Sequence, residues 1–199
     1  MNKLTSRDIQ AQKTKRKIIQ ACIDLMEDHD FNDIKITDIC KKTELSVGAF
    51  YHHFNTKYDI LIEIDKELDV YFFEKILPLC MEMDPIEGIV HYFCCQSDNV
   101  NSYGVHVIRN LYKAQLDTEN FLQEFKEKRH FPEGARLLLI RAKESQRLSE
   151  QTDIEGLLNA LLSINHGIFY TWCLSNGTLD IKNYTTTILH HYLNDFINR

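Results

Sequence analysis

Glycine and proline, the residues that interrupt regular secondary structure, are scarce here: seven and three in 199 residues. A β-rich chain of this length would need many turns, which draw on these residues. Apolar residues instead recur three or four positions apart, as in amphipathic helices. The sequence therefore predicts an all-α fold of about nine or ten helices. The expected segments are roughly 7–29, 38–43, 47–53, 57–77, 85–96, 100–116, 118–128, 132–147, 153–175 and 181–198.

Composition points to an ordinary globular protein, with 44% hydrophobic and 26% charged residues. The first residues are polar and basic, without an apolar signal segment. Six cysteines are scattered and form no C-x-x-C pair. We therefore expect a cytoplasmic protein with reduced thiols and no membrane partner.

The formal net charge is −6, yet six of the first 17 residues are basic and only Asp8 is acidic. A basic arm on an acidic chain suggests that one end meets a polyanion. The alternative is a solvated N-terminal arm without a partner.

Two short helices at 37–54 form the strongest local pattern. Thr37 is expected to cap the first and Ser46 the second, with Thr43–Ser46 between them. This length is typical of a helix-turn-helix, whose second helix enters the DNA major groove. The alternative is a plain helical hairpin.

The second helix has residues suited to a groove. Gly48 and Ala49 are small enough for the backbone to approach bases. Phe50 and Phe54, four apart, are expected to face inward, so that Tyr51 and His52 point away with hydrogen-bond donors.

The next helix should begin at a capping box, Thr56 to Asp59, and end or kink near Pro78. Lys57 lies in its first turn, where a cation is mildly unfavourable unless an anion docks there. The helix is therefore expected to offer a phosphate contact, the alternative being a solvated lysine.

The run from Ile39 to Leu61 closely resembles the DNA-binding signature of the tetracycline-repressor (TetR) family. Gly48, Tyr51, His53, Phe54 and Lys57 stand in the family's register. Glu44 departs from the usual turn glycine, Val47 and Ala49 replace commoner polar residues, and Phe50 replaces a leucine. The resemblance implies DNA contacts by Thr37, Ser46, Val47, Gly48, Ala49, Tyr51, His52 and Lys57.

The same resemblance implies an N-terminal three-helix helix-turn-helix DNA-binding domain at 1–56. A helical ligand-binding and dimerisation domain would follow at 57–199, joined through a connecting helix at 57–77. The implied function is a transcriptional regulator that binds a near-palindromic double-stranded operator as a homodimer and is released by a small-molecule effector. A repressor is favoured over an activator, because occluding a promoter requires only occupancy.

Residues 156–179 contain no Asp, Glu, Lys or Arg. Interior polar residues make a membrane span unfavourable, so this helix should be buried on nearly all sides. A second copy of the chain would cover it, together with the last helix; the alternative is a monomer with this helix at its centre. The expected interface residues are Leu162, Phe169, Ile188, Leu189, Tyr192 and Phe196.

An effector site is expected among the central helices, although each of its residues could instead serve core packing or lie on the surface. The candidates are aromatic or weakly polar, with the cation Arg109 among them: Tyr71, His91, Phe93, Cys95, Tyr103, His106, Arg109, Asn110, Tyr112, Phe125, His166, Tyr170 and Trp172.

Two other functional classes are considered, a metal or redox sensor and an enzyme. His91, Cys94 and Cys95 have the helical spacing of a metal- or redox-sensing face. An enzyme is disfavoured, because the chain lacks the H-E-x-x-H, G-x-S-x-G and phosphate-loop motifs. The sequence thus predicts a regulator that is not an enzyme and has neither a cofactor nor a bound metal.

Overall fold

A computed structural model describes residues 5–117 and 129–197. Within these ranges the chain is helical and contains no strand, only an isolated β-bridge between Leu148 and Ile197. The all-α prediction is confirmed. The helix expected at 118–128 lies outside the described residues.

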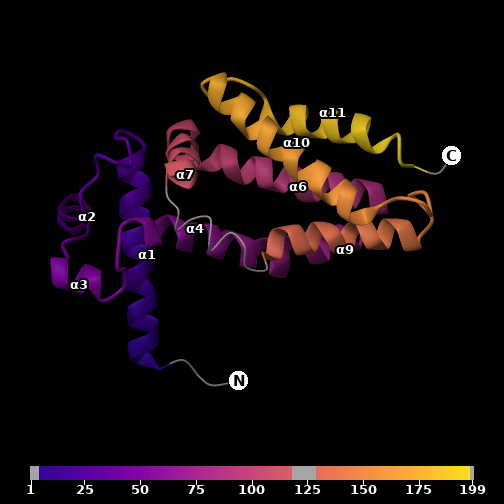
Figure 1. Cartoon of the computed structure of the whole chain (residues 1–199). Helices are drawn as coiled ribbons and strands as arrows, with labels where there is room; N and C mark the ends of the chain where they lie inside the picture. The colour runs from indigo at the N-terminus through magenta and orange to yellow at the C-terminus, as the bar shows by residue number, and fades with distance from the viewer. Residues whose placement is uncertain (1–4, 118–128, 198–199) are drawn as a thin grey trace. The chain divides into compact units, whose positions relative to one another are not determined.

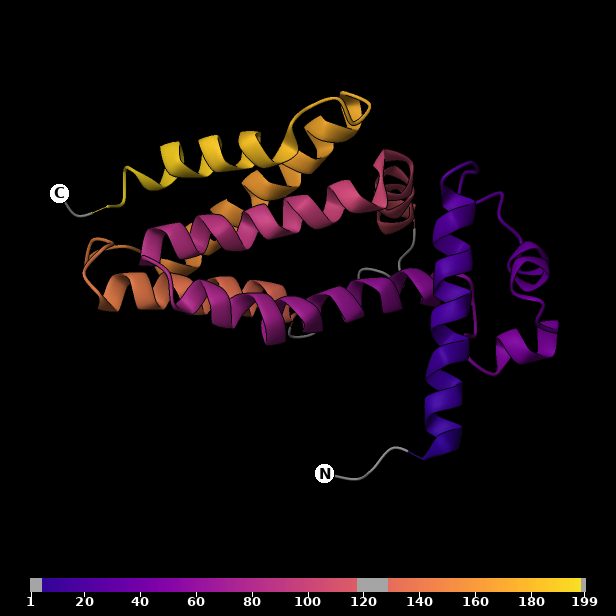
Figure 2. The same ribbon diagram turned by 180° about the vertical axis from the view of Figure 1, so that it is seen from behind.

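Figures 1 and 2 show the order of the helices along the chain. The first four are α1 (Ser6–Met26), α2 (Ile36–Thr43), α3 (Val47–Tyr51) and α4 (Tyr58–Tyr71). A π-helical turn (Phe72–Ile76) leads into α5 (Leu77–Met81), α6 (Pro85–Tyr103) and α7 (Val105–Asp117). The described C-terminal helices are α9 (His130–Glu144), α10 (Ile154–Leu174) and α11 (Ile181–Leu193).

The chain divides into two compact units. The N-terminal unit comprises Met1–Lys66 and His106–Glu124, and the C-terminal unit comprises Glu67–Val105 and Phe125–Arg199. Helix α7 thus joins the unit that contains α1 to α3, although some fifty residues separate them in sequence.

Helix caps form at three starts, at two of which, Ser46 and Thr56, the sequence predicts them. The Ser46 Oγ accepts from the Ala49 N–H at 3.1 Å, and the Asp84 carboxylate accepts from the Ile86 N–H at 3.1 Å. At α4, Thr56 and Asp59 bond each other's backbone N–H groups at 3.1–3.3 Å. Each cap satisfies donors that a helix start leaves unpaired.

Two expectations about helix ends were wrong. Lys35, not Thr37, is the N-cap of α2, because the Asp38 carboxylate reaches back to the Lys35 N–H at 3.0 Å. Helix α6 does not end near residue 96 but continues to Gly104, whose φ of 82° ends it. The interruption expected near Pro78 is present, because α4 gives way to the π-helical turn and a new helix, α5, begins at Leu77 and continues to Met81.

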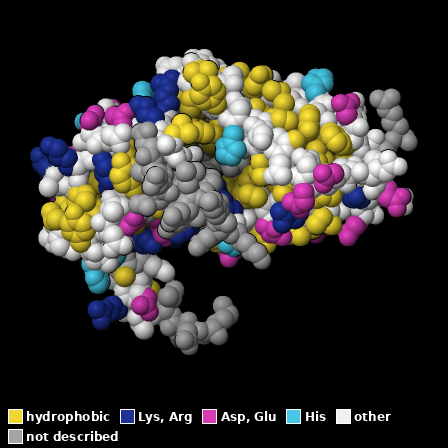
Figure 3. Space-filling model, viewed as in Figure 1, with side chains coloured by type: hydrophobic (Ala, Val, Ile, Leu, Met, Phe, Trp, Pro, Cys, Tyr) yellow, Lys and Arg dark blue, Asp and Glu magenta, His cyan; other side chains and the backbone are white. Residues whose placement is uncertain are grey.

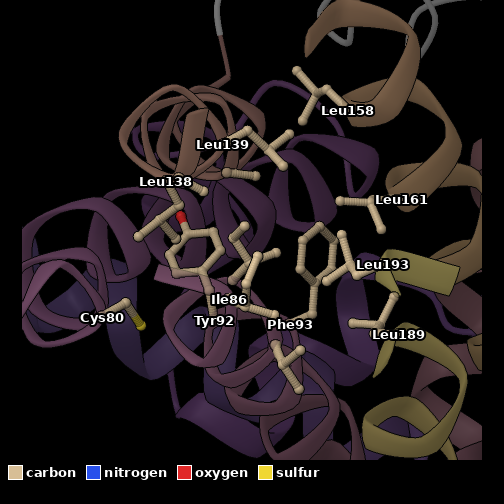
Figure 4. Packing of buried hydrophobic residues seen from close by; sticks show 14 of the residues in the cluster. Cys80, Ile86, Tyr92, Phe93, Leu138, Leu139, Leu158, Leu161, Leu189 and Leu193 are labelled. Atoms are coloured by element: carbon tan, nitrogen blue, oxygen red, sulfur yellow. The ribbon is translucent and has the colours of Figure 1, made fainter. Parts of the chain in front are cut away.

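The C-terminal unit has an apolar core around α6 (Figure 4). The rings of Tyr92 and Phe131 stack with centroids 4.7 Å apart. Leucines from α9, α10 and α11 close around α6: Leu138, Leu139, Leu158, Leu161, Leu189 and Leu193.

The N-terminal unit buries the apolar face of α1. Ile18, Cys22 and Met26 are fully buried, as are Ile39 of α2 and Phe50 of α3. This small core fixes α2 and α3 against α1, and so determines which side chains of α3 remain exposed.

Candidate nucleic-acid interface

Helices α2 and α3 are joined by a tight turn. Glu44 adopts a left-handed conformation with φ 57° and ψ 31°, and the following Leu45 N–H donates to the Cys40 carbonyl at 3.0 Å. The turn therefore forms although a glutamate stands at the left-handed position. Such a conformation costs an L-residue about 1–2 kcal/mol, which makes glycine the favoured residue there.

Helix α3 buries one side and exposes the other. Phe50 and Phe54 are buried with ring centroids 5.9 Å apart, which confirms that they face inward. Val47 is 43% exposed and Tyr51 is 52% exposed. The helix thus presents a short face of small and hydrogen-bonding residues to the outside.

Gly48 lies on this exposed face. A Cβ atom built there would meet only the Ser46 Oγ, at 3.9 Å. The described residues therefore leave room for a side chain, and glycine within a helix costs about 1 kcal/mol relative to alanine. Packing within the unit does not explain this glycine, whereas close approach of a partner to the backbone would.

The residues expected to contact DNA mostly lie at the surface. Ala49 and Lys57 are half-buried, and the others are exposed: Thr37, Ser46, Val47, Gly48, Tyr51 and His52. Their contacts with DNA stay predictions.

Lys57 has an internal role that the sequence did not indicate. Its Nζ donates to the carbonyls of Phe31, Asn32 and Ile34 at 2.7, 2.8 and 2.9 Å. It also lies 4.8 Å from the centroid of the Phe31 ring, and burial lowers the pKa of Lys57. The three N–H groups of an ammonium are thus all engaged by the segment between α1 and α2. A phosphate contact by this side chain would replace one of these bonds.

The segment between α1 and α2 is also held by α7. The buried Asn110 accepts from the Phe31 N–H at 2.9 Å and donates to the carbonyls of Met26 and His29 at 3.3 and 3.1 Å. Lys113 of α7 pairs with Asp30, which lowers the pKa of that carboxyl. The sequence predicts Asn110 at an effector site. In the structure its side-chain amide instead forms hydrogen bonds with the backbone at the end of α1 and just after it.

Basic side chains gather in a shallow groove of about 500 Å³ between α1 and α2. Lys13, Arg16 and Lys17 line it from α1 and Lys42 from α2, with Asp24 pairing Lys42 at 3.3 Å. The basic residues that the sequence places near the N-terminus thus lie along one side of α1, where they could contact DNA phosphates.

Two histidines follow α3. The rings of His52 and His53 lie 5.4 Å apart, and His52 is exposed. Burial, His52 and Lys15 lower the pKa of His53 from its ordinary value of 6.5, so this ring is neutral at pH 7.

A cavity of about 730 Å³ lies in the C-terminal unit. The residues that start α9 form one wall, and Phe73, Gln96, Leu162, Asn165 and His166 contribute to the others. Among the described residues expected at an effector site, His166 is the one that lines it.

The other described residues expected at an effector site do not line this cavity. Tyr71 and Tyr170 are more than half exposed, whereas Phe93 and Trp172 are core residues. His91, Cys95 and Tyr103 are half-buried, and Phe125 lies outside the described residues. Four belong to the N-terminal unit: His106, Arg109, Asn110 and Tyr112.

The metal- or redox-sensing alternative is not supported. Cys94 is buried and bonds Thr186 at 3.1 Å, and the His91 Nε2 lies 3.4 Å from the Cys95 Sγ. Burial raises the pKa of both thiols, which disfavours the reactive thiolate. Over residues 5–117 and 129–197, no group of three His, Cys, Asp or Glu side chains could hold a metal ion.

Helix α10 carries an uncharged exposed face. Tyr170 is 60% and Leu174 68% exposed, with Ser163 and Gly167 exposed on the same side. Hydrophobic side chains gather over α10 and α11 in Figure 3. Of the expected interface residues, Phe169 and Leu189 are buried within their own unit. The remaining four are half-buried: Leu162, Ile188, Tyr192 and Phe196.

None of the helices in the described ranges is long and apolar enough to cross a membrane.

Residues 18–64 match the sequence profile of the family described as bacterial regulatory proteins, tetR family. No protein of curated function has significant sequence similarity to the chain.

Solved structures share the fold over nearly the whole chain. The fatty acid degradation regulator FadR from Bacillus halodurans has a TM-score of 0.79 at 17% identity, covering 100% of both chains. FadR from Bacillus subtilis, solved with stearoyl-CoA, has a TM-score of 0.75 at 18% identity, and the match covers 88% of this chain and 95% of that one. SmeT, the repressor of the Stenotrophomonas maltophilia multidrug efflux pump SmeDEF, has a TM-score of 0.73 at 17% identity. The match covers 94% of this chain and 92% of that one.

Proposed function

This chain belongs to the TetR family of transcriptional regulators, and from that premise we propose that it binds a near-palindromic DNA operator as a homodimer and represses transcription. It would act in the cytoplasm by occupying the operator, without catalysing a reaction.

The exposed Gly48 on the Ser46-capped helix α3 is the observation that supports DNA binding most strongly. The fold leaves space at this position, so the glycine is best explained by a partner that comes close to the backbone. Val47 and Tyr51 flank it with an apolar surface for thymine methyls and a hydroxyl for phosphate or base edges. The groove of Lys13, Arg16, Lys17 and Lys42 supplies charge for the phosphates.

Dimerisation is proposed through α10 and α11. A face that exposes Tyr170 and Leu174 without charge is the kind of surface that a second copy covers. Gly167, exposed in the middle of α10, would let two helices approach closely. A twofold pair would present two α3 helices to half-sites about 34–36 Å apart, or farther on a widened operator.

An effector is proposed to bind in the cavity of the C-terminal unit and release the operator. Its volume of about 730 Å³ is typical of small-molecule sites. FadR from Bacillus subtilis was solved with stearoyl-CoA, and a molecule with an apolar part would also suit the aromatic walls here.

The test is selection of duplexes from a random pool by the full-length protein. We expect enrichment of one near-palindromic sequence, with affinity falling on the order of a thousandfold between 50 and 200 mM salt. A pool without enrichment would contradict the proposal.

A further inference from the structure

The cavity of the C-terminal unit has both apolar and polar walls. Phe73, Phe131, Pro132 and Leu162 provide apolar surface, and the Phe73 ring lies 5.4 Å from that of His130. An occupant is therefore expected to carry an apolar body.

The cations in the wall already face carboxylates. Arg129 lies 3.4 Å from Asp69, whose carboxylate also accepts from the backbone N–H groups of His130 and Phe131 at 2.7 and 3.2 Å. Asp69 of α4 thereby provides acceptors for two backbone N–H groups that the start of α9 would leave unpaired. The side chain of Arg129, the N-cap residue, forms no capping hydrogen bond.

Arg136 is paired in the same way. It lies 2.9 Å from Glu133 and 2.8 Å from Glu155. With both arginines matched by acids, an additional anion would compete with internal carboxylates, so the charges of the wall favour a neutral occupant.

The wall also contains a neutral polar residue, Asn165, with an acceptor that no described residue satisfies. Asn165 is 2% exposed, and its Nδ2 donates to the Gln96 Oε1 at 2.7 Å. Its Oδ1 is buried and accepts no hydrogen bond from any described residue. Buried acceptors without a donor are rare and unfavourable, and both Asn165 and Gln96 line the cavity.

We propose that the cavity selects a neutral amphipathic molecule whose hydroxyl or N–H group donates to Asn165, while its apolar body packs against Phe73, Phe131 and Leu162. This inference rests on the proposed effector role of the cavity and adds the chemical class of the ligand.

Three probes of matched size test it by calorimetric titration of the full-length protein at pH 7. 4-Octylphenol is neutral and has a donor, 4-octylanisole is neutral without one, and 4-octylbenzoate is an anion. We expect the phenol to bind about tenfold more tightly than the anisole, and the benzoate to bind more weakly than the phenol. Equal affinity of phenol and anisole, tighter binding of the benzoate, or no binding of any probe would overturn the proposal.

The variant Asn165→Leu tests whether the preference for the phenol over the anisole arises at Asn165. It should remove the difference between phenol and anisole, whereas Asn165→Asp, which keeps an acceptor, should retain it. Asn159→Leu makes the same change at an exposed position of α10 and should bind as the wild type does. A phenol preference that survives in a folded Asn165→Leu protein would contradict the assignment; if that variant does not fold, the comparison of probes on the wild type still decides.

The two proposals fail separately. Binding of the probes is measured without DNA, so a protein that binds its operator but shows no donor preference loses this inference alone. A phenol that binds with the expected preference but does not release the operator would instead contradict the proposed regulation.

Discussion

At the scale of single residues, Gly48 links the fold to its proposed function. Alanine fits the space around Gly48 and favours the helix, so Gly48→Ala should raise the free energy of unfolding by up to about 1 kcal/mol. The added methyl would stand between the backbone and the DNA, so operator affinity should fall. Thermal melting and duplex titration measure the two effects; tighter DNA binding together with higher stability would contradict this role.

Glu44 gives a second prediction at this scale. Replacing it by glycine relieves the left-handed conformation, and Glu44→Gly should stabilise the protein by about 0.5–1 kcal/mol in a denaturant titration. Glu27, the C-cap of α1, has φ −63° and ψ −37°, so Glu27→Gly should instead destabilise by a similar amount. The same sign for both changes would show that the backbone conformation at Glu44 is not the cause.

At the scale of the elements, α7 holds the junction of α1 and α2. Asn110→Ala leaves the buried Phe31 N–H without an acceptor, which should cost about 1–3 kcal/mol. Hydrogen exchange of the Phe31 amide should accelerate, and the melting temperature should fall. Asn101→Ala, at an exposed position of α6, is the control. Unchanged exchange at Phe31 would mean that the amide of Asn110 does not hold this segment.

The same elements show how far the sequence could predict the fold. The Ser46 cap and the Thr56–Asp59 box join residues three apart, so a local pattern contains them fully. Lys57 binds residues 23 to 26 positions away, and Asn110 binds Phe31 79 positions away. No local pattern specifies such contacts, and for that reason the roles of Lys57 and Asn110 were missed.

Apart from His166, the residues that line the cavity were missed for the same reason. Its wall joins the π-helical turn, α6, α9 and α10, and the choice of aromatic and weakly polar residues by type could not tell core residues such as Phe93 and Trp172 from lining residues. A usable signal was the polar Asn165 within the uncharged stretch 156–179. A polar residue at this position argues against a membrane span, but it also indicates a group that needs a hydrogen-bond partner once the helix is buried.

At the scale of the whole molecule, the proposed binding of two operator half-sites requires a dimer. Leu174→Glu places a charge on the exposed face of α10 and should give a folded monomer with weaker operator affinity. Sedimentation velocity measures the change. Leu79→Glu makes the same substitution at a 61% exposed position of α5 and should leave the dimer intact. A Leu174→Glu protein that stays dimeric would exclude this face.

The most direct measurement is the affinity of wild type and Tyr51→Ala for the duplex that the wild type selects. Tyr51 is 52% exposed, so its loss should hardly alter melting. Tyr51→Ala should bind the selected duplex at least about tenfold more weakly while remaining folded and dimeric. Equal affinity of the two proteins for that duplex would contradict the claim that α3 reads DNA.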